Sequence, residues 1–296
     1  MNFKTRFAPS PTGPLHLGHA YSALVAAQLA HVHNGAFLLR IEDIDQARSR
    51  PQWEAQIFDD LRWLGLSWPE PVMRQSDNLA RYRAALARLW SDGLLYTCHC
   101  NRRDIQAAVA APQEGAPMMG PDGVIYPGTC RDLPRTPNAP MPDTAALRLD
   151  MSMALRRLPQ QITFAEMTCP AHKGDVATLS NRLPVFIGDV VLCRRDMGTS
   201  YHLSVVLDDA TQMVTDVVRG EDLEPATGIH VILQKLLDLP TPTYHHHRLI
   251  RDDAGKRLAK RDDARAIATY RADGATPHDI RAMVGLPSLF EENPRG

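Results

Sequence analysis

The sequence predicts an α/β fold built on a parallel β-sheet, because strand-like and helix-like patterns alternate over its first hundred residues. We interpret Arg6–Ala8 as the end of a first buried strand, and the short apolar run Phe37–Ile41 predicts a second. After His16, over Trp53–Leu64 and over Leu79–Gly93, apolar residues recur at helical spacing, which predicts three helices. In such an order of elements, ligands bind beyond the carboxyl ends of the strands.

The pattern changes between Thr97 and Pro184, where proline and glycine are frequent and long helical periods stop. We therefore expect an insertion packed on the sheet domain. Beyond it the sequence predicts strands at 186–192 and 213–218, a helix at 227–239, a loop at 251–255 and helices at 264–272 and 277–284. Four regions follow: the first half of the sheet domain (1–96), the insertion (97–184), the second half (185–240) and a C-terminal loop with helices (241–296).

The composition is that of an ordinary globular protein, with 44% hydrophobic and 23% charged residues and a net charge of −1. The absence of a long apolar run or a signal-peptide pattern predicts a cytoplasmic protein without a membrane span. The segment from Arg248 to Arg271 is rich in lysine and arginine. It predicts either a local basic face for nucleic acid or a solvated helix surface.

The segment between Arg6 and His19 predicts an anion site. Its prolines and Gly13 force a turn between the first strand and the helix that starts at His16. Free N–H groups and the helix dipole favour phosphate at such a helix start. His16 and His19 lie three residues apart, on one helix face, where both can donate hydrogen bonds to phosphate oxygens. The alternative is a capped core helix that happens to contain two histidines.

The same segment resembles the first signature of the class I aminoacyl-tRNA synthetases, usually His-Ile-Gly-His, and the preceding Phe-Ala-Pro-Ser-Pro-Thr-Gly resembles their glutamyl and glutaminyl branch. The run from Arg257 to Arg261 resembles the second signature, Lys-Met-Ser-Lys-Ser. Arginine replaces its first lysine and alanine its first serine, while Lys260 keeps the second lysine. The resemblance implies a Rossmann-type core with a zinc-containing insertion and a short C-terminal helical segment. It implies catalytic roles for His16, His19 and Lys260, and ATP contacts from His16, Gly18, His19, Arg257 and Lys260.

Two further segments resemble the amino-acid pocket of the glutamyl enzymes, namely 195–209 and 218–223. The resemblance implies that the glutamate site is lined by Arg6, Ala8, Ser10, Glu42, Tyr201 and Arg219. A dicarboxylic substrate needs an arginine for its side-chain carboxylate and an acid for its ammonium group. Arg6 or Arg219 suits the first task and Glu42 the second, and which arginine takes which carboxylate stays open. Alternatively, Glu42 caps a turn and Arg219 pairs with Glu221 or Asp222.

The cysteines of the insertion predict a metal site. Cys98 and Cys100 place two thiols on one side of a turn, and Cys130 adds a third after a loop. Three soft ligands suit Zn²⁺ in a small module with little core of its own. The alternative is three reduced thiols without a metal. Cys169 and Cys193 stand alone and are expected to be buried or incidental.

The fourth ligand is open from the residues themselves, because His99, His172 and Tyr126 all compete. The zinc-bearing proteins that this chain resembles have Cys-x-Cys followed by Tyr-x-x-x-Cys. That resemblance implies the set Cys98, Cys100, Tyr126 and Cys130. A second candidate for metal binding is the run 245–247 of three histidines, which we interpret as a polar strand edge because no acidic or cysteine partner lies at ligand spacing.

The resemblance implies ATP-dependent activation of L-glutamate, assisted by Mg²⁺, to glutamyl-adenylate and pyrophosphate. Thirty-five residues follow Arg261, so we expect no anticodon-binding domain. Paralogues of this layout transfer glutamate to the queuosine base in the anticodon loop of tRNA(Asp), and ATP, glutamate and this tRNA are the implied partners of a monomer. Two alternatives stay open. One is an enzyme that charges a tRNA 3′ end with a separate anticodon-binding partner, and the other is an idle RNA-binding paralogue.

Overall fold

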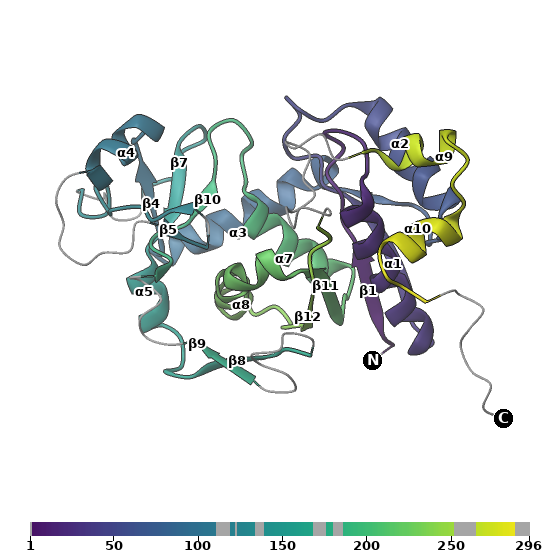
Figure 1. Ribbon diagram of the computed structural model, residues 1–296. Helices are drawn as coiled ribbons and strands as arrows, with labels where there is room; N and C mark the ends of the chain where they lie inside the picture. The colour runs from purple at the N-terminus through teal and green to yellow at the C-terminus, as the bar shows by residue number, and fades with distance from the viewer. Residues whose placement is uncertain are drawn as a thin grey trace.

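The computed structural model describes residues 2–110, 119–121, 123–133, 139–167, 176–179, 186–251 and 265–287. Two groups of elements are visible in Figure 1. One contains the N-terminal and C-terminal helices, and the other contains the insertion. Strands β1, β11 and β12 lie between them and carry the pocket described below.

Five parallel-paired strands form the central layer: β1 (Lys4–Phe7), β2 (Ala36–Ile41), β3 (Met73–Arg74), β11 (Asp216–Gly220) and β12 (Thr243–His247). β2 pairs with β1 and β3, and β11 pairs with β12. β1 lies against β11, where the Thr215 amide donates to the Lys4 carbonyl at 3.1 Å. The chain leaves β1 towards β2 on one side and returns as β11 on the other. This is the topological switch point at which ligands bind in such sheets.

Helices pack around this layer in two hydrophobic cores. The first core joins the sheet to α1 (Leu17–Val32), α2 (Pro51–Trp63), α9 (Ile267–Ala272) and α10 (Pro277–Met283). The second joins α3 (Leu79–Ser91), α7 (Tyr201–Thr211) and α8 (Thr227–Leu236) to the insertion. In Figure 1 the yellow α10 lies beside the purple α1, so the two ends of the chain share one core. None of the described helices is long and apolar enough to cross a membrane.

The insertion contributes β7 (Ala146–Leu149) to an antiparallel sheet whose other strands flank it in the sequence, in the order β10 (Val191–Cys193), β7 and β4 (Leu95–Cys98). Its other elements are α4 (Arg102–Ala110), α5 (Met151–Arg156) and the strand pairs β5 (Met119–Gly120) with β6 (Gly123–Val124) and β8 (Ile162–Ala165) with β9 (Val176–Leu179). Two short 3-10 helices, η1 (Gln75–Asn78) and η2 (Glu221–Ala226), lead into α3 and α8. The boundaries of the four predicted regions stay predictions.

Most of the predicted elements within the described residues are confirmed, and three differences have physical causes. The loop predicted at 251–255 lies outside the described residues except for Arg251. The strand predicted at 186–192 begins only at Val191, because Gly188 adopts a φ of +70° and breaks the run, and it pairs with β7 rather than with the parallel layer. The helix α4 was missed among the prolines of its surroundings. The helix α7 was missed because every residue from His202 to Asp209 is buried, so it shows no alternation of apolar and polar faces.

A buried ion-pair network joins the two halves of the chain. The Arg40 side chain on β2 is fully buried, and its Nη1 donates to Asp209 Oδ1 on α7 at 2.7 Å. Its Nη2 donates to Glu42 Oε1 at 3.2 Å, and its Nε lies 3.8 Å from Asp208 Oδ2. One guanidinium therefore faces three carboxylates. Removing one partner of such a group leaves a buried charge without compensation.

We predict that Arg40→Met lowers the free energy of unfolding by about 3–5 kcal/mol, because three buried carboxylates lose a shared cation. Urea denaturation followed by circular dichroism measures this change. Arg83→Met is the matched control, since Arg83 forms an exposed ion pair with Asp143, and we expect it to cost about 1 kcal/mol or less. Equal destabilisation by the two substitutions would contradict the role given to Arg40.

Candidate functional site

A pocket of about 620 Å³ opens at the carboxyl ends of β1 and β11. It is lined by all nine of the predicted small-molecule contacts that lie in the described residues: Arg6, Ala8, Ser10, His16, Gly18, His19, Glu42, Tyr201 and Arg219. Arg257, Lys260, Cys169 and His172 lie outside the described residues. The fold thus brings together side chains from segments more than two hundred residues apart, and their binding roles stay predictions.

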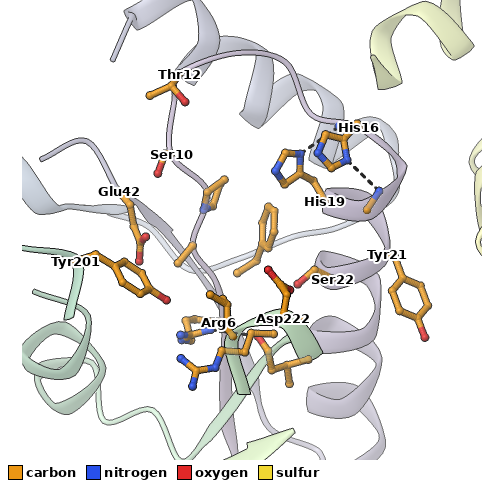
Figure 2. A pocket seen from close by; sticks show the side chains of 18 of the residues that line it. Arg6, Ser10, Thr12, His16, His19, Tyr21, Ser22, Glu42, Tyr201 and Asp222 are labelled. Carbon is orange, nitrogen blue, oxygen red and sulfur yellow. Dashed lines mark hydrogen bonds between the residues drawn. The ribbon is translucent and has the colours of Figure 1, made fainter. Parts of the chain in front are cut away.

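The histidine end of the pocket is the start of α1. His16 is the N-cap of this helix, and its Nδ1 accepts a hydrogen bond from the Gly18 amide at 3.1 Å. The His19 Nδ1 accepts from the His16 amide at 3.2 Å, and the two ring centroids lie 3.8 Å apart. Figure 2 shows the two rings side by side. Because each Nδ1 accepts, each neutral ring carries its proton on Nε2, where it is a hydrogen-bond donor.

Gly18 permits the close approach of the His16 ring. A Cβ at this position would lie 3.1 Å from His16 Cε1 and 3.2 Å from its Nδ1. The neighbouring imidazole would have to shift, and the cap at the helix start would weaken. The sequence pattern His-x-Gly-His thus has a local structural reason, independent of any ligand.

The opposite end of the pocket carries Arg6, Glu42 and Tyr201, which Figure 2 shows on the side away from the histidines. Arg6 donates from Nε to Asp209 Oδ1 at 3.0 Å and from Nη1 to the Val218 carbonyl at 3.2 Å. Burial opposes ionisation of Asp209, but the Arg6 and Arg40 guanidiniums hold the pKa of that carboxyl below its usual range. Arg6 is therefore paired with a carboxylate that it shares with Arg40.

Glu42 follows β2 directly, and its backbone fixes the turn after β1. The Glu42 amide donates to the Pro9 carbonyl at 3.0 Å, while its carboxylate accepts from Arg40. The backbone of Glu42 thus holds the loop after β1, while its side chain lines the pocket. Burial raises the pKa of the Glu42 carboxyl, against the lowering effect of the Arg40 and Arg6 guanidiniums. Burial likewise raises the pKa of the Tyr201 phenol.

Arg219 ends β11 and is 4% exposed. It donates to His246 Nε2 at 3.0 Å, to His230 Nδ1 at 2.9 Å and to Thr227 Oγ1 at 2.6 Å. The alternative pairing with Glu221 or Asp222 is not among the contacts of the described part of the chain. Burial and the neighbouring Arg219 charge hold the pKa of His230 well below its usual value, so this imidazole is neutral.

The three histidines at 245–247 form β12, which confirms a strand and corrects its predicted polar character. His245 and His246 are 8% and 3% exposed, and each meets a carboxylate from a distant part of the sequence. His245 Nε2 lies 2.7 Å from Asp216 Oδ1, and His246 Nδ1 lies 2.5 Å from Glu166 Oε2. These partners lie 29 and 80 residues away, so spacing along the sequence could not reveal them.

The predicted metal-binding thiols converge in the insertion. The Sγ atoms of Cys98, Cys100 and Cys130 all lie within 4.8 Å of one another, and within the described ranges this is the only such group that can hold a metal ion. The Tyr126 hydroxyl lies 3.6 Å from Cys98 Sγ and 3.4 Å from Cys100 Sγ. His99 is exposed. Of the competing fourth ligands within the described residues, Tyr126 is the one that faces the thiols.

Arg148 on β7 completes this cluster. Its Nε donates to Cys98 Sγ at 3.3 Å, and its guanidinium carbon lies 3.8 Å from the centre of the Tyr126 ring. A cation at this position stabilises thiolate ligands. The sequence analysis did not identify Arg148 as part of the site. The observation that could have indicated it is an arginine within the otherwise apolar strand 146–149. Cys193 is a buried free thiol away from this cluster.

Comparison with known proteins adds family information. Residues 2–289 match the family model described as tRNA synthetases class I (E and Q), catalytic domain. A protein of Rhodobacter capsulatus named Glutamyl-Q tRNA(Asp) synthetase is 62% identical over 95% of this chain and 99% of its own length. A protein of the same name from Nocardia farcinica is 42% identical over 95% of this chain and 85% of its own length.

Among solved structures, a glutamate-tRNA synthetase from Elizabethkingia anophelis aligns with a TM-score of 0.71 at 24% identity, covering 94% of this chain. A glutamate tRNA ligase from Elizabethkingia meningosepticum, solved with its amino acid, gives 0.69 at 24% identity over 94% of this chain. This chain spans 60% and 59% of those two proteins. At this identity the likeness concerns the fold.

Proposed function

The chain belongs to the family of class I tRNA synthetase catalytic domains for glutamate and glutamine, and on that premise we propose that it activates L-glutamate with ATP and transfers it to the queuosine base of tRNA(Asp). The observation that supports activation is the single pocket with two unlike ends. Imidazole N–H donors at the start of α1 face one end, and arginines, Glu42 and Tyr201 line the other.

The activation step requires positioning rather than acid–base chemistry. The α-carboxylate oxygen of glutamate attacks the α-phosphorus of ATP, the bond to the bridging oxygen breaks, and pyrophosphate leaves with its charge. The attacking carboxylate is already ionised, so no general base is needed. The Nε2–H donors of His16 and His19 stabilise the charge that develops on the phosphoryl oxygens. Mg²⁺ accompanies ATP as a substrate cation.

The charges of the residues that line the pocket indicate where glutamate would bind. Glu42 suits the substrate ammonium group, and Arg6 and Arg219 suit its carboxylates. On the sequence resemblance alone, Arg257 and Lys260 contribute cations for the pyrophosphate. The choice of the queuosine base as acceptor is supported by the name shared by the relatives from Rhodobacter capsulatus and Nocardia farcinica.

We also propose one structural Zn²⁺, held by Cys98, Cys100, Tyr126 and Cys130. The donor set fits, because three thiols and one phenol oxygen converge on one point beside the Arg148 cation. The local hydrophobic cluster contains few buried residues. A tetrahedral metal would therefore stabilise this part of the insertion where side-chain packing contributes little.

We predict that the protein catalyses glutamate-dependent exchange of pyrophosphate into ATP without tRNA, and that His19→Asn lowers this rate by about 100-fold or more. The asparagine side chain can retain the acceptor for the His16 amide but lacks the Nε2–H donor. His31→Asn, at the exposed end of the same helix, is the matched control and should leave the rate unchanged. An absence of exchange in the unaltered protein would refute the proposed enzyme.

The acceptor can be identified by periodate oxidation of the 3′-terminal ribose of tRNA(Asp) before charging. If glutamate is attached to the base, loss of the 3′-terminal cis-diol by itself does not prevent charging with radioactive glutamate, whereas charging at the 3′ end requires that diol. As a matched substrate, tRNA(Asp) lacking queuosine should accept no label. Charging of the queuosine-free tRNA at its 3′ end would show that the protein is a conventional charging enzyme instead.

For the metal site, we predict about one zinc per chain by elemental analysis of the native protein. Tyr126→Phe should weaken zinc retention against a chelator by at least about tenfold, because the phenol oxygen is lost. Cys193→Ser is the matched control, a buried thiol outside the cluster, and should retain zinc fully. Metal-free native protein, or equal retention in all three proteins, would contradict the assignment.

A further inference from the structure

A buried chain of polar side chains runs behind Arg219, away from the substrate pocket. Its members are Arg219, His246 and Glu166, which are 4%, 3% and 1% exposed. Arg219 Nε donates to His246 Nε2 at 3.0 Å, and His246 Nδ1 lies 2.5 Å from Glu166 Oε2. The His246 amide also donates to Glu166 Oε1 at 3.2 Å. Both carboxylate oxygens are therefore used on a single histidine.

The arginine determines which nitrogen of His246 carries the proton. A guanidinium has donors and no acceptor, so His246 Nε2 must present its lone pair to Arg219. The ring proton is then on Nδ1, where Glu166 accepts it. With the opposite tautomer, the imidazole N–H would face the guanidinium N–H, and Arg219 would lose an acceptor. Glu166 stabilises the one tautomer that suits the arginine.

The other partners of Arg219 obey the same rule. His230 Nδ1 accepts from Arg219, so its proton is on Nε2, which lies 3.0 Å from His202 Nδ1. Thr227 Oγ1 accepts from Nη2. Two neutral imidazoles and a hydroxyl thus fix the orientation of the guanidinium, one on each of its three nitrogens. The carboxylate in this chain of contacts, Glu166, reaches Arg219 only through the His246 ring.

This arrangement differs from that of the two neighbouring arginines. Arg6 and Arg40 both donate directly to Asp209, and Arg40 also faces Asp208 and Glu42. Their charges are balanced by carboxylates at contact distance. Arg219 is fixed equally well, but its direct partners within the described structure are uncharged. Its charge remains available to a carboxylate that enters the pocket.

Glu166 reaches this position from the insertion. It follows β8 and forms a bridge with Tyr244 of β12, where the Met167 amide donates to the Tyr244 carbonyl at 3.0 Å. Phe164 packs against the Tyr244 ring at a centroid distance of 5.5 Å. These contacts fix the Glu166 backbone against the edge of the parallel layer. The carboxylate is therefore placed by packing and not by a ligand.

We propose that Glu166 is a positioning residue for substrate recognition: it fixes the tautomer of His246, and His246 in turn holds Arg219 as a substrate-carboxylate receptor. The inference rests on the proposed glutamate activation. It assigns selectivity for an anionic substrate over its neutral amide, glutamine, to a residue that does not line the pocket.

The test measures steady-state pyrophosphate exchange with glutamate, glutamine and ATP as varied substrates. Glu166→Ala should raise KM for glutamate by about 10- to 100-fold, because a buried hydrogen bond to a charged group becomes misaligned, while KM for ATP and kcat change by less than about threefold. The preference for glutamate over glutamine should fall by a similar factor. A loss of stability alone would not separate KM for glutamate from KM for ATP.

Two further variants make the test specific to the tautomer. His246→Gln places an amide oxygen near the former Nε2 position, where it accepts from Arg219 whatever residue occupies position 166. In that background, Glu166→Ala should change KM for glutamate by less than about threefold. Asp216→Ala is the matched control, because it removes the carboxylate partner of His245 on the same strand. It should leave KM for glutamate unchanged.

Thermal unfolding establishes that each variant is folded. If Glu166→Ala does not fold, Glu166→Gln replaces it. Its single amide oxygen serves only one of the two His246 N–H groups, so KM for glutamate should still rise. An unchanged KM for glutamate in either folded variant overturns the inference, as does an equal effect in the His246→Gln background. If the unaltered protein shows no glutamate-dependent exchange, the proposed function itself fails.

Discussion

The structure depends on the buried pairing of arginines from the first two strands with the carboxylates of α7. Arg6 lies on β1 and Arg40 on the neighbouring β2, and both donate to Asp209, at 3.0 and 2.7 Å. Two buried guanidiniums are tolerated only beside compensating carboxylates. The second half of the chain supplies these through Asp208 and Asp209, so α7 can dock in essentially one way. This docking closes the pocket between β1 and β11.

The pocket inherits its two unlike ends from this arrangement. The start of α1 offers N–H donors, because both histidine Nδ1 atoms accept from the backbone. The strand ends offer two arginines that differ in their partners. Arg6 is paired with the carboxylate of Asp209, whereas Arg219 is held by neutral imidazoles. A reaction that joins a phosphate ester to a carboxylate needs both ends at once. Such a reaction requires hydrogen-bond donors and charges in fixed positions, and it does not require a residue that transfers a proton.

Sequence patterns predicted the local parts of this site and missed the long-range ones. His16, Gly18 and His19 could be singled out because they lie within one turn of helix, and the three clustered cysteines because Cys-x-Cys and a further cysteine are a recognisable set of metal ligands. The Arg6–Asp209 and Glu166–His246 pairs join residues 203 and 80 positions apart, and nothing in a sequence states which buried charges will meet. The helix α7 was missed for a related reason, since complete burial removes the periodic pattern by which helices are predicted.

On the proposed function, the same charge arrangement would let such a pocket separate glutamate from glutamine. The two molecules have nearly the same size, so shape contributes little, and the difference must come from unpaired hydrogen-bonding groups. The side-chain amide of glutamine presents N–H donors as well as an oxygen. A guanidinium that is already fixed by three acceptors cannot reorient to avoid facing those N–H donors. Among the described residues, the direct hydrogen-bond partners of Arg219 are two imidazoles and a hydroxyl, so it shares no hydrogen bond with a carboxylate. A neutral substrate would therefore leave the buried Arg219 charge without a counter-charge. Because the imidazoles behind Arg219 hold it rigidly, the guanidinium could not move to relieve this free-energy cost, and glutamine would bind more weakly than glutamate.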